Sequence, residues 1–201
     1  MKTQTLKKLV IASVAAASCG ALFATPISNS ATGLASPATT ITFDEHALSV
    51  GESVTNQYSD LGVTFTPNLY YSSQTGFPNI VGNTITNFHP EIPQFSLNFL
   101  TTQNAIAFAM VSNSSVWNFT ALLGDAVVES FSASVDTSAN NFFGFTGINF
   151  DQIRITTPND YMIIDNLQLS NNSTVPEPES LALVGLGLAC LAFMRPKAKK
   201  A

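Results

Sequence analysis

Residues 94–112 read QFSLNFLTTQNAIAFAMVS, and this stretch decides the class of fold. Its first part, Phe95-Ser96-Leu97-Asn98-Phe99, alternates apolar and small polar residues with a period of two. Such alternation is typical of a strand with one buried and one polar face. Its second part, Ala105 to Val111, is continuously apolar, as expected of a central strand that is covered on both faces. The stretch therefore predicts a sheet packed on a hydrophobic core.

Further strands are predicted on both sides of this stretch. Residues 40–43, 63–66 and 152–156 repeat the period of two, and the chain between them is rich in Thr, Phe, Val and Ile. Residues of these types favour strands. Turn signals such as Gly51 and Gly124 recur at spacings of about ten residues, which is typical of an antiparallel sandwich. We therefore expect an all-β fold, an antiparallel β-sandwich of jelly-roll-like form.

The domain boundaries follow from where the strand pattern stops. We place the sandwich at residues 40–170, as a single domain of ordinary size. Residues 25–39 are rich in Ser, Ala, Thr and Pro without periodicity, and residues 171–175 are mostly polar. Both segments are therefore predicted to be linkers.

The central part of the chain is strongly acidic. Between Thr25 and Val175 eleven acidic residues stand against one basic residue, Arg154, so the net charge is −10 and lysine is absent. A surface of this sign repels phosphate backbones, which excludes nucleic acid and leaves neutral sugars or divalent cations as plausible ligands. Both cysteines, Cys19 and Cys190, lie outside the predicted domain, so the domain has no intrachain disulfide.

The N-terminus has the order of a secretory signal peptide. Three lysines precede an apolar run from Leu9 to Phe23. We predict a signal peptide helix over residues 1–24, removed by signal peptidase after Ala24, with cleavage after Ala21 or Ala31 as alternatives. The chain is therefore expected to be exported across an inner membrane.

The C-terminus combines a Pro-Glu-Pro element, an apolar run and a basic end. Pro176, Glu177 and Pro178 precede an apolar run at residues 181–194, which predicts a short transmembrane helix. A helix of this length rises about 21 Å, less than the roughly 30 Å of a hydrocarbon core, so it would be a marginal anchor. The basic residues that follow should stay in the cytoplasm; they are Arg195, Lys197, Lys199 and Lys200.

This tail, residues 176–201, resembles the PEP-CTERM sorting signal. The residues that carry the resemblance are Pro176-Glu177-Pro178-Glu179 and the preceding Val175. The resemblance implies processing by an exosortase, a membrane transpeptidase that recognises the Pro-Glu-Pro element. It also implies a Gram-negative, exopolysaccharide-producing host, with the protein transiently anchored in the inner membrane and then moved to the cell surface or the extracellular matrix. An ordinary C-terminal membrane anchor is the alternative.

The domain itself resembles the jelly-roll domains that such proteins carry, through Ile41-Thr42-Phe43-Asp44-Glu45 near its start and Ile163-Ile164-Asp165-Asn166-Leu167 near its end. Similar acids in some jelly-roll carbohydrate-binding modules imply a structural calcium site. Strict alternation would place Glu45 on one apolar face with Ile41 and Phe43. It would place Asp165 on another with Ile163, Leu167 and Leu169. Glu45 and Asp165 are therefore our candidate calcium ligands. Alternatively, both acids lie at strand ends and accept backbone N–H bonds.

The remaining candidates concern ligand binding. Tyr70 and Tyr71 are adjacent, so they cannot share one buried face, and one of them is our candidate for contact with a sugar ring. Trp117 and Phe119 are expected to face the core together. We find no nucleophile elbow, zinc helix, P-loop or dinucleotide fingerprint, and we expect His46 to lie in an exposed loop.

Two classes of function remain open. The first is a non-catalytic surface or matrix protein, sorted through its tail, which binds exopolysaccharide or surface partners. The second is a secreted polysaccharide-active enzyme of the glycoside hydrolase type, because eleven acids offer many possible carboxylate pairs. The first interpretation is favoured, since the sequence carries no distinctive catalytic constellation.

Overall fold

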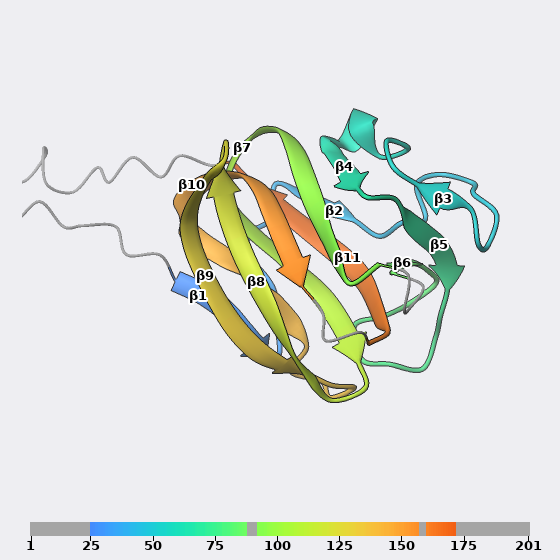
Figure 1. The fold of residues 1–201 in the computed structure, drawn as a ribbon. Helices are drawn as coiled ribbons and strands as arrows, with labels where there is room; N and C mark the ends of the chain where they lie inside the picture. The colour runs from blue at the N-terminus through green and yellow to red at the C-terminus, as the bar shows by residue number, and fades with distance from the viewer. Residues whose placement is uncertain (1–24, 88–91, 157–159, 172–201) are drawn as a thin grey trace, which may run out of the picture.

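The computed structural model describes residues 25–87, 92–156 and 160–171, and this part of the chain is an all-β domain (Figure 1). All strand pairs in it are antiparallel. The described strands are β1 (Thr25–Ser30), β2 (Thr39–Ile41), β3 (Ser53–Val54), β4 (Val63–Thr66), β5 (Leu69–Ser73), β6 (Asn83–Thr86), β7 (Gln94–Ser112), β8 (Ser115–Leu123), β9 (Ala126–Val135), β10 (Phe142–Thr156) and β11 (Met162–Ser170). A short 3-10 turn, η1 (Ser59–Leu61), precedes β4.

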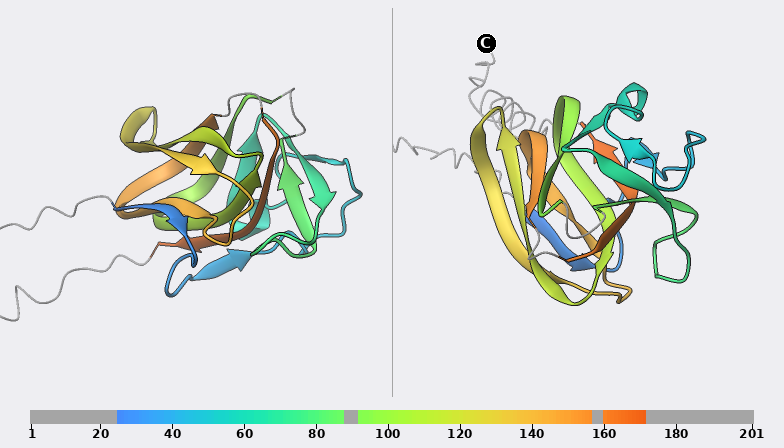
Figure 2. Two further views of the ribbon diagram at one scale, coloured as in Figure 1. Left: turned by 90° about the horizontal axis from the view of Figure 1, so that it is seen from below. Right: turned by 45° about the vertical axis from the view of Figure 1, so that its right-hand side comes forward.

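Two long strands, β7 and β10, lie side by side and belong to both halves of the sandwich. The first half of β7 pairs with β4 on one side and with the end of β10 on the other. Beyond β10, β8 pairs with β10 and β9 pairs with β8. The second half of β7 pairs with β11 on one side and with the start of β10 on the other. Beyond β10, β1 pairs with the start of β10. Beyond β11 follow β6, β5 and β3. The network thus folds over on itself, which is visible in the two views of Figure 2.

The bend is visible in which residues of β7 are buried. Phe95, Leu97 and Phe99 point into the main core, and so do Ile106 and Phe108, so the inward face changes from odd to even numbers. The change falls where the β7–β10 pairing jumps in register, between residues 98 and 103 of β7. Extra residues of this kind bend a strand and increase its twist. The prediction of a central strand at residues 105–111 is confirmed.

Aromatic side chains fill the core between the two halves. Trp117 and Phe119 of β8 are fully buried, as predicted. The Phe119 ring stacks on Phe143 of β10 at 5.2 Å and on Phe131 of β9 at 4.9 Å between ring centroids. Burial of each such side chain contributes about 1.5 to 3 kcal/mol, so this cluster joins β8, β9 and β10.

The expectation of a linker at residues 25–39 was wrong for its first part. Residues 25–30 form β1, which pairs with β10 through Thr25 opposite Thr146 and Ile27 opposite Gly144. The side chain of Ile27 packs on a second, smaller apolar cluster that includes Ala107 and Phe142. The strand β1 is mostly exposed on both faces. Its sequence therefore lacks the alternation of apolar and polar residues that indicates a half-buried strand.

Both ends of the described domain lie at the same end of the sandwich. Thr25 is paired with Thr146, Thr146 with Ala105, and Ala105 with Ser170, so the start of β1 and the end of β11 lie in one row across four neighbouring strands. We call this the proximal end. The opposite, distal end contains the end of β7 and the starts of β10 and β11.

The predicted signal peptide, the sorting element and the helix at 181–194 lie outside the described residues. Within the part of the chain that the structure describes, no helix is long and apolar enough to cross a membrane.

Candidate functional site

The first acidic segment is held in a tight turn around Phe43. Phe43 has a positive φ of 61°, and its carbonyl accepts hydrogen bonds from the hydroxyls of Tyr58 at 3.0 Å and Tyr71 at 3.1 Å. The left-handed residue breaks the alternation expected for residues 41–45. Ile41 and Phe43 are both buried, but Glu45 is exposed and accepts bonds from the backbone N–H and the hydroxyl of Thr42. The expectation that Glu45 shares their apolar face was therefore wrong.

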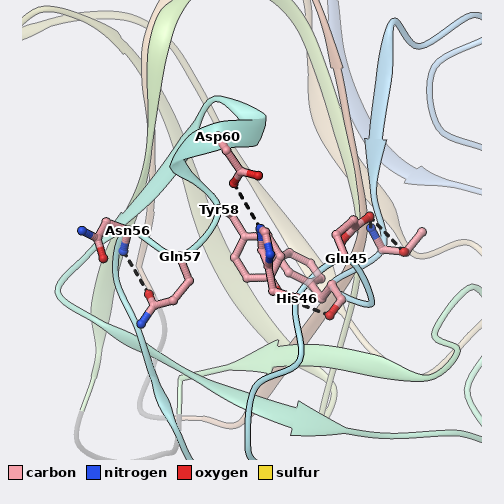
Figure 3. A network of polar contacts seen from close by, with 8 residues as sticks. Glu45, His46, Asn56, Gln57, Tyr58 and Asp60 are labelled. Atoms are coloured by element: carbon pink, nitrogen blue, oxygen red, sulfur yellow. Dashed lines mark hydrogen bonds and ion pairs between the residues drawn. The ribbon is translucent and has the colours of Figure 1, made fainter.

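His46 follows in the same turn and is paired with Asp60 of η1. The distance from His46 Nε2 to Asp60 Oδ1 is 3.1 Å, and the imidazole lies 5.0 Å from the Tyr58 ring (Figure 3). Burial raises the pKa of the Tyr58 phenol, and the negative charges nearby raise it further, so this phenol stays neutral. The contacts of His46 with Asp60 and with the buried Tyr58 thus anchor the loop to the core. The other histidine, His89, lies outside the described residues.

Asp165 shares a face with Ile163, as predicted, but not with Leu167 and Leu169. The β11–β7 pairing passes from Asp165 opposite Ala109 to Gln168 opposite Ala107, so β11 carries one extra residue. Asn166, at this bulge, has a positive φ of 49°. A bulge of this kind reverses the alternation, so Leu167 faces the main core while Asp165 lies with Ala109 on the outer face of the sheet.

The Asp165 carboxylate is buried under the loop at residues 77–83. The residue is 1% exposed, and its two oxygens accept the backbone N–H groups of Val81 at 2.8 Å and Asn166 at 2.6 Å. Burial raises the pKa of Asp165 to about 6, opposed by these two bonds and reinforced by the charges of Asp44 and Glu45. Three carboxylates thus lie within electrostatic range of one another.

These acids do not form a ready metal centre. Within residues 25–87, 92–156 and 160–171, no three His, Cys, Asp or Glu side chains are grouped so that they could hold a metal ion. Asp44 instead accepts hydrogen bonds from the backbone and side chain of Asn83. Calcium at Glu45 and Asp165 therefore stays a prediction.

A network of asparagines fixes the loop above Asp165. Asn79 has a positive φ of 58°, and its side chain donates to Asn141 Oδ1 at 2.8 Å. Asn141 in turn donates to the Pro78 carbonyl at 2.6 Å, and Asn166 donates to the Asn79 carbonyl at 2.8 Å. Pro and Asn are residues that favour turns, but the pair Pro78-Asn79 does not by itself indicate which strand the turn covers.

The two candidate tyrosines have different environments. Tyr71 is 3% exposed, and its hydroxyl donates to the carbonyls of Phe43 and His46. Tyr70, between the buried Leu69 and Tyr71, is half-buried and packs in part against the main core. Of the two, Tyr70 is the one that presents side-chain surface for contact with a ligand.

Tyr70 belongs to a row of residues on the outer face of the sheet. It is opposite Thr86, Thr86 is opposite Ile163, and Ile163 is opposite Val111. Directly opposed residues on neighbouring strands have their side chains on the same face. We call these four residues the outer row.

The outer row ends at a hollow at the distal end of the domain, which we call the distal hollow. Its volume is about 60 Å³. Val111 and Ile163, a cross-strand pair, contribute to its lining together with Phe77, Asn113, Thr137 and Tyr161. The sequence does not point to this hollow, because it gives no sign that the end of β7 and the start of β11 lie together.

Asp160 and its partners hold one side of the distal hollow. Burial alone would raise the pKa of Asp160, but hydrogen bonds from Ser115, Asn113 and the Tyr161 N–H hold it below its usual range. These bonds measure 2.6 Å, 3.0 Å and 2.8 Å. The indole N–H of Trp117 donates to the Ser115 hydroxyl at 2.9 Å, so the network is tied to the buried core.

A second hollow, of about 120 Å³, lies at the proximal end. Thr39, Leu61, Thr101, Gln103 and Ser170 are among the residues that line it. Among the residues that the structure describes, no acidic side chain lines this proximal hollow or the distal hollow. The described residues therefore place no paired carboxylates of a glycoside hydrolase in either of them.

Comparison with known proteins identifies the tail. Residues 174–195 match the PEP-CTERM protein-sorting motif, so the chain carries this sorting motif directly after the β-domain. The resemblance inferred from Pro176, Glu177 and Pro178 is thereby confirmed. No curated protein matches the chain.

The β-domain has low similarity to solved carbohydrate-binding modules of family 29. One such module matches with a TM-score of 0.32 and 16% identity, over 54% of this chain and 90% of the module. An aspartate-to-alanine mutant of the CBM29-2 module matches with a TM-score of 0.34 and 15% identity, over 78% of this chain and 99% of the module. Similarity at this level does not support an inference about binding.

Proposed function

We propose that the protein is an exported, non-catalytic surface protein that is sorted through its PEP-CTERM tail and binds neutral polysaccharide through its β-sandwich. The observation that carries the proposal is the position of the sorting motif. It begins at residue 174, shortly after the last strand ends at Ser170. The β-domain is thus the part of the chain that sorting delivers to the cell surface.

In this proposal both ends of the chain serve export. Signal peptidase removes residues 1–24, and the helix at 181–194 holds the chain in the inner membrane of a Gram-negative cell until an exosortase cleaves at the Pro-Glu-Pro element. Arg195, Lys197, Lys199 and Lys200 hold the cytoplasmic side. Cleavage after Ala24 is supported by β1, because cleavage after Ala31 would remove that strand.

The charge of the domain and the lining of its hollows support binding without catalysis. A net charge of −10 disfavours anionic ligands, and the single basic residue, Arg154, is hydrogen-bonded to Gln152 on the same strand. Neutral sugars carry no charge for this surface to repel. The interpretation as a glycoside hydrolase has no geometric support in the two hollows, because the described residues bring no carboxylate to either lining.

The sorting proposal is tested by changing the Pro-Glu-Pro element. In a host that carries an exosortase, the double variant Pro176→Ala with Pro178→Ala should remain full length in the inner membrane, whereas the wild-type chain is shortened and reaches the surface. The measurement is the intact mass of the chain in each membrane fraction. Pro196→Ala, which lies just beyond the matched motif, is the control and should be processed normally. Normal processing of the double variant would overturn the proposal.

We also propose a structural calcium ion near Glu45 and Asp165. Asp165 and Asp44, the neighbour of Glu45, accept the backbone N–H groups of Val81 and Asn83 in the same short segment. Calcium should stabilise the folded chain by about 2.7 kcal/mol at a hundredfold excess over its Kd. The gain should disappear in Asp165→Asn. If a chelator leaves the melting temperature of the wild-type chain unchanged, the two acids have the capping roles seen in their hydrogen bonds.

A further inference from the structure

We propose that the distal hollow between Phe77 and Tyr161 is a carbohydrate subsite that takes a neutral pyranose bearing an acetamido group. This inference rests on the proposed function, and it adds the place and the chemical class of the ligand. The acetamido methyl group would enter the hollow, and the sugar ring would lie outside it against the exposed aromatic side chain of Tyr161.

The distal hollow is small. Its volume of about 60 Å³ is a few times the roughly 10–15 Å³ that one water molecule needs on the same measure. We therefore match it to a substituent of a few heavy atoms, such as an acetamido group, and place the sugar ring outside it.

The lining of the hollow matches the two halves of that group. Val111 and Ile163 lie directly opposite each other on β7 and β11 and form an apolar surface with Phe77. An apolar surface of this kind suits a methyl group. Thr137 and Asn113 bring a hydroxyl and a side-chain amide to the same hollow, and these groups suit an amide N–H and carbonyl.

Asn113 is held in place before any ligand arrives. Its side-chain NH₂ donates to Asp160 Oδ1 at 3.0 Å, which leaves its carbonyl oxygen as the acceptor for a ligand N–H. Asp160 is itself fixed by Ser115, and Ser115 by the buried Trp117. A polar group that is already ordered loses little entropy on binding.

The ring would be recognised by Tyr161, whose side chain is well placed at the rim. Tyr161 is 47% exposed although it lines the hollow. Its backbone is fixed, because its carbonyl accepts the Ser112 hydroxyl at 2.6 Å. Aromatic faces of this kind pack against the C–H surface of sugars.

The outer row gives the site an extension and a direction. Tyr70 lies three strands from Val111. Neighbouring strands are separated by roughly 4.7–4.9 Å, so an extended oligosaccharide could reach from the hollow to Tyr70. The site is at the distal end, opposite to Ser170, where the tail leaves the domain. A polysaccharide outside the cell can therefore approach it without passing the membrane side.

The test compares two neutral oligosaccharides on the full-length protein. Titration calorimetry with an oligomer of N-acetylglucosamine and with the matching oligomer of glucose should show binding at least tenfold tighter for the acetylated sugar. Tyr161→Ala and Asn113→Ala should each weaken binding about tenfold without changing the melting temperature by more than a few degrees. Thr101→Ala, in the proximal hollow, is the matched control and should bind as the wild type does.

Each outcome separates the subsite from the proposed function. Equal affinity for both oligomers would overturn the acetamido assignment while leaving polysaccharide binding intact. Tight binding that survives Tyr161→Ala and Asn113→Ala would overturn the distal hollow as its place. Absence of binding to either oligomer would overturn this inference, and the sorting proposal would still stand or fall on the Pro176 and Pro178 variant.

Discussion

Asp165 is the residue at which charge, burial and backbone geometry are most closely combined. It lies beneath Val81 and beside the bulge at Asn166, in the field of Asp44 and Glu45. A carboxylate in such a place costs free energy in its charged form, which its two backbone hydrogen bonds offset only in part. The neutral form is therefore favoured in the folded chain more than in the unfolded chain.

This imbalance predicts a pH dependence of stability with a definite sign. The pKa of Asp165 is raised from 3.8 to about 6 on folding. Its contribution to stability is therefore fully present below about pH 4 and is lost as the pH rises through about 6. At about 1.4 kcal/mol per pKa unit, the change is about 2 to 3 kcal/mol.

The measurement is the free energy of unfolding of the wild type and of Asp165→Asn between pH 4 and pH 7. The wild type should lose stability relative to the variant as the pH rises. The pKa values of Asp136 and Asp160 are lowered, so their contributions to the stability of the domain are lost as the pH falls. Both chains share these contributions, so the difference in stability between the two chains removes them. A difference that is constant with pH would contradict the assignment to Asp165.

The same residues show what a strict alternation of strand faces can predict. Trp117 and Phe119 lie in a regular strand, so the period of two placed both of them correctly in the core. Glu45 was assigned to the wrong face, and Asp165 was wrongly grouped with Leu167, because Phe43 and Asn166 have positive φ values. Phe43 gives no sign of its left-handed backbone in the sequence. Asn166 is of a type that adopts this conformation more often than other non-glycine residues, but asparagine alone does not locate a bulge.

At the scale of elements, long strands were predicted better than the segments that cover them. The apolar run at residues 105–111 identified the centre of the sheet, because a strand buried on both faces is continuously apolar in this way. The distal hollow was not predicted, since it arises where the end of β7 and the start of β11 lie beside the loop that carries Phe77. Contacts of this kind depend on pairing between distant parts of the chain.

The strand β1 leads to a prediction about the mature N-terminus. A chain that begins at Thr25 keeps β1 paired with β10. A chain that begins at Thr32 loses the backbone pairing of β1, the packing of Ile27 and the hydrogen bond from Asn29 to the Ser134 carbonyl. Each lost hydrogen bond costs about 0.5 to 1.5 kcal/mol, so the shorter chain should be less stable by about 2 kcal/mol or more.

Urea unfolding of the two chains measures this difference, and Edman sequencing of the exported protein shows which N-terminus the cell produces. We expect Thr25 at the mature N-terminus. Ser28→Ala is the control for local changes in β1, because the Ser28 hydroxyl donates to the neighbouring Asn29 within the same strand. Equal stability of the chains that begin at Thr25 and Thr32 would show that β1 is dispensable, and cleavage after Ala31 would then be compatible with the fold.

At the scale of the whole molecule, the topology orients the domain relative to its tail. Thr25 and Ser170 lie in one row across β1, β10, β7 and β11 at the proximal end. The full length of β11, from Met162 to Ser170, separates this end from the distal hollow. Each residue of such a strand adds about 3.4 Å, so the separation is most of the length of the sandwich. In the proposed function both processing events thus occur near one end, away from the proposed subsite.

This orientation predicts different distances from the membrane before the tail is cleaved. The segment between Ser170 and Leu181 reaches at most about 35 Å when fully extended, so the proximal end must stay near the bilayer, while the distal end is on average farther away. The test attaches a dye to Thr101→Cys at the proximal end or to Asn140→Cys at the distal end, and both positions are exposed. The labelled chain begins at Thr25 and carries Cys190→Ala, so that the introduced cysteine is the single site of labelling. With the uncleaved chain in liposomes, energy transfer to a dye in the lipid should be stronger from position 101. Equal or reversed transfer would mean that another face of the domain rests on the membrane, and the distal hollow would then not face outward.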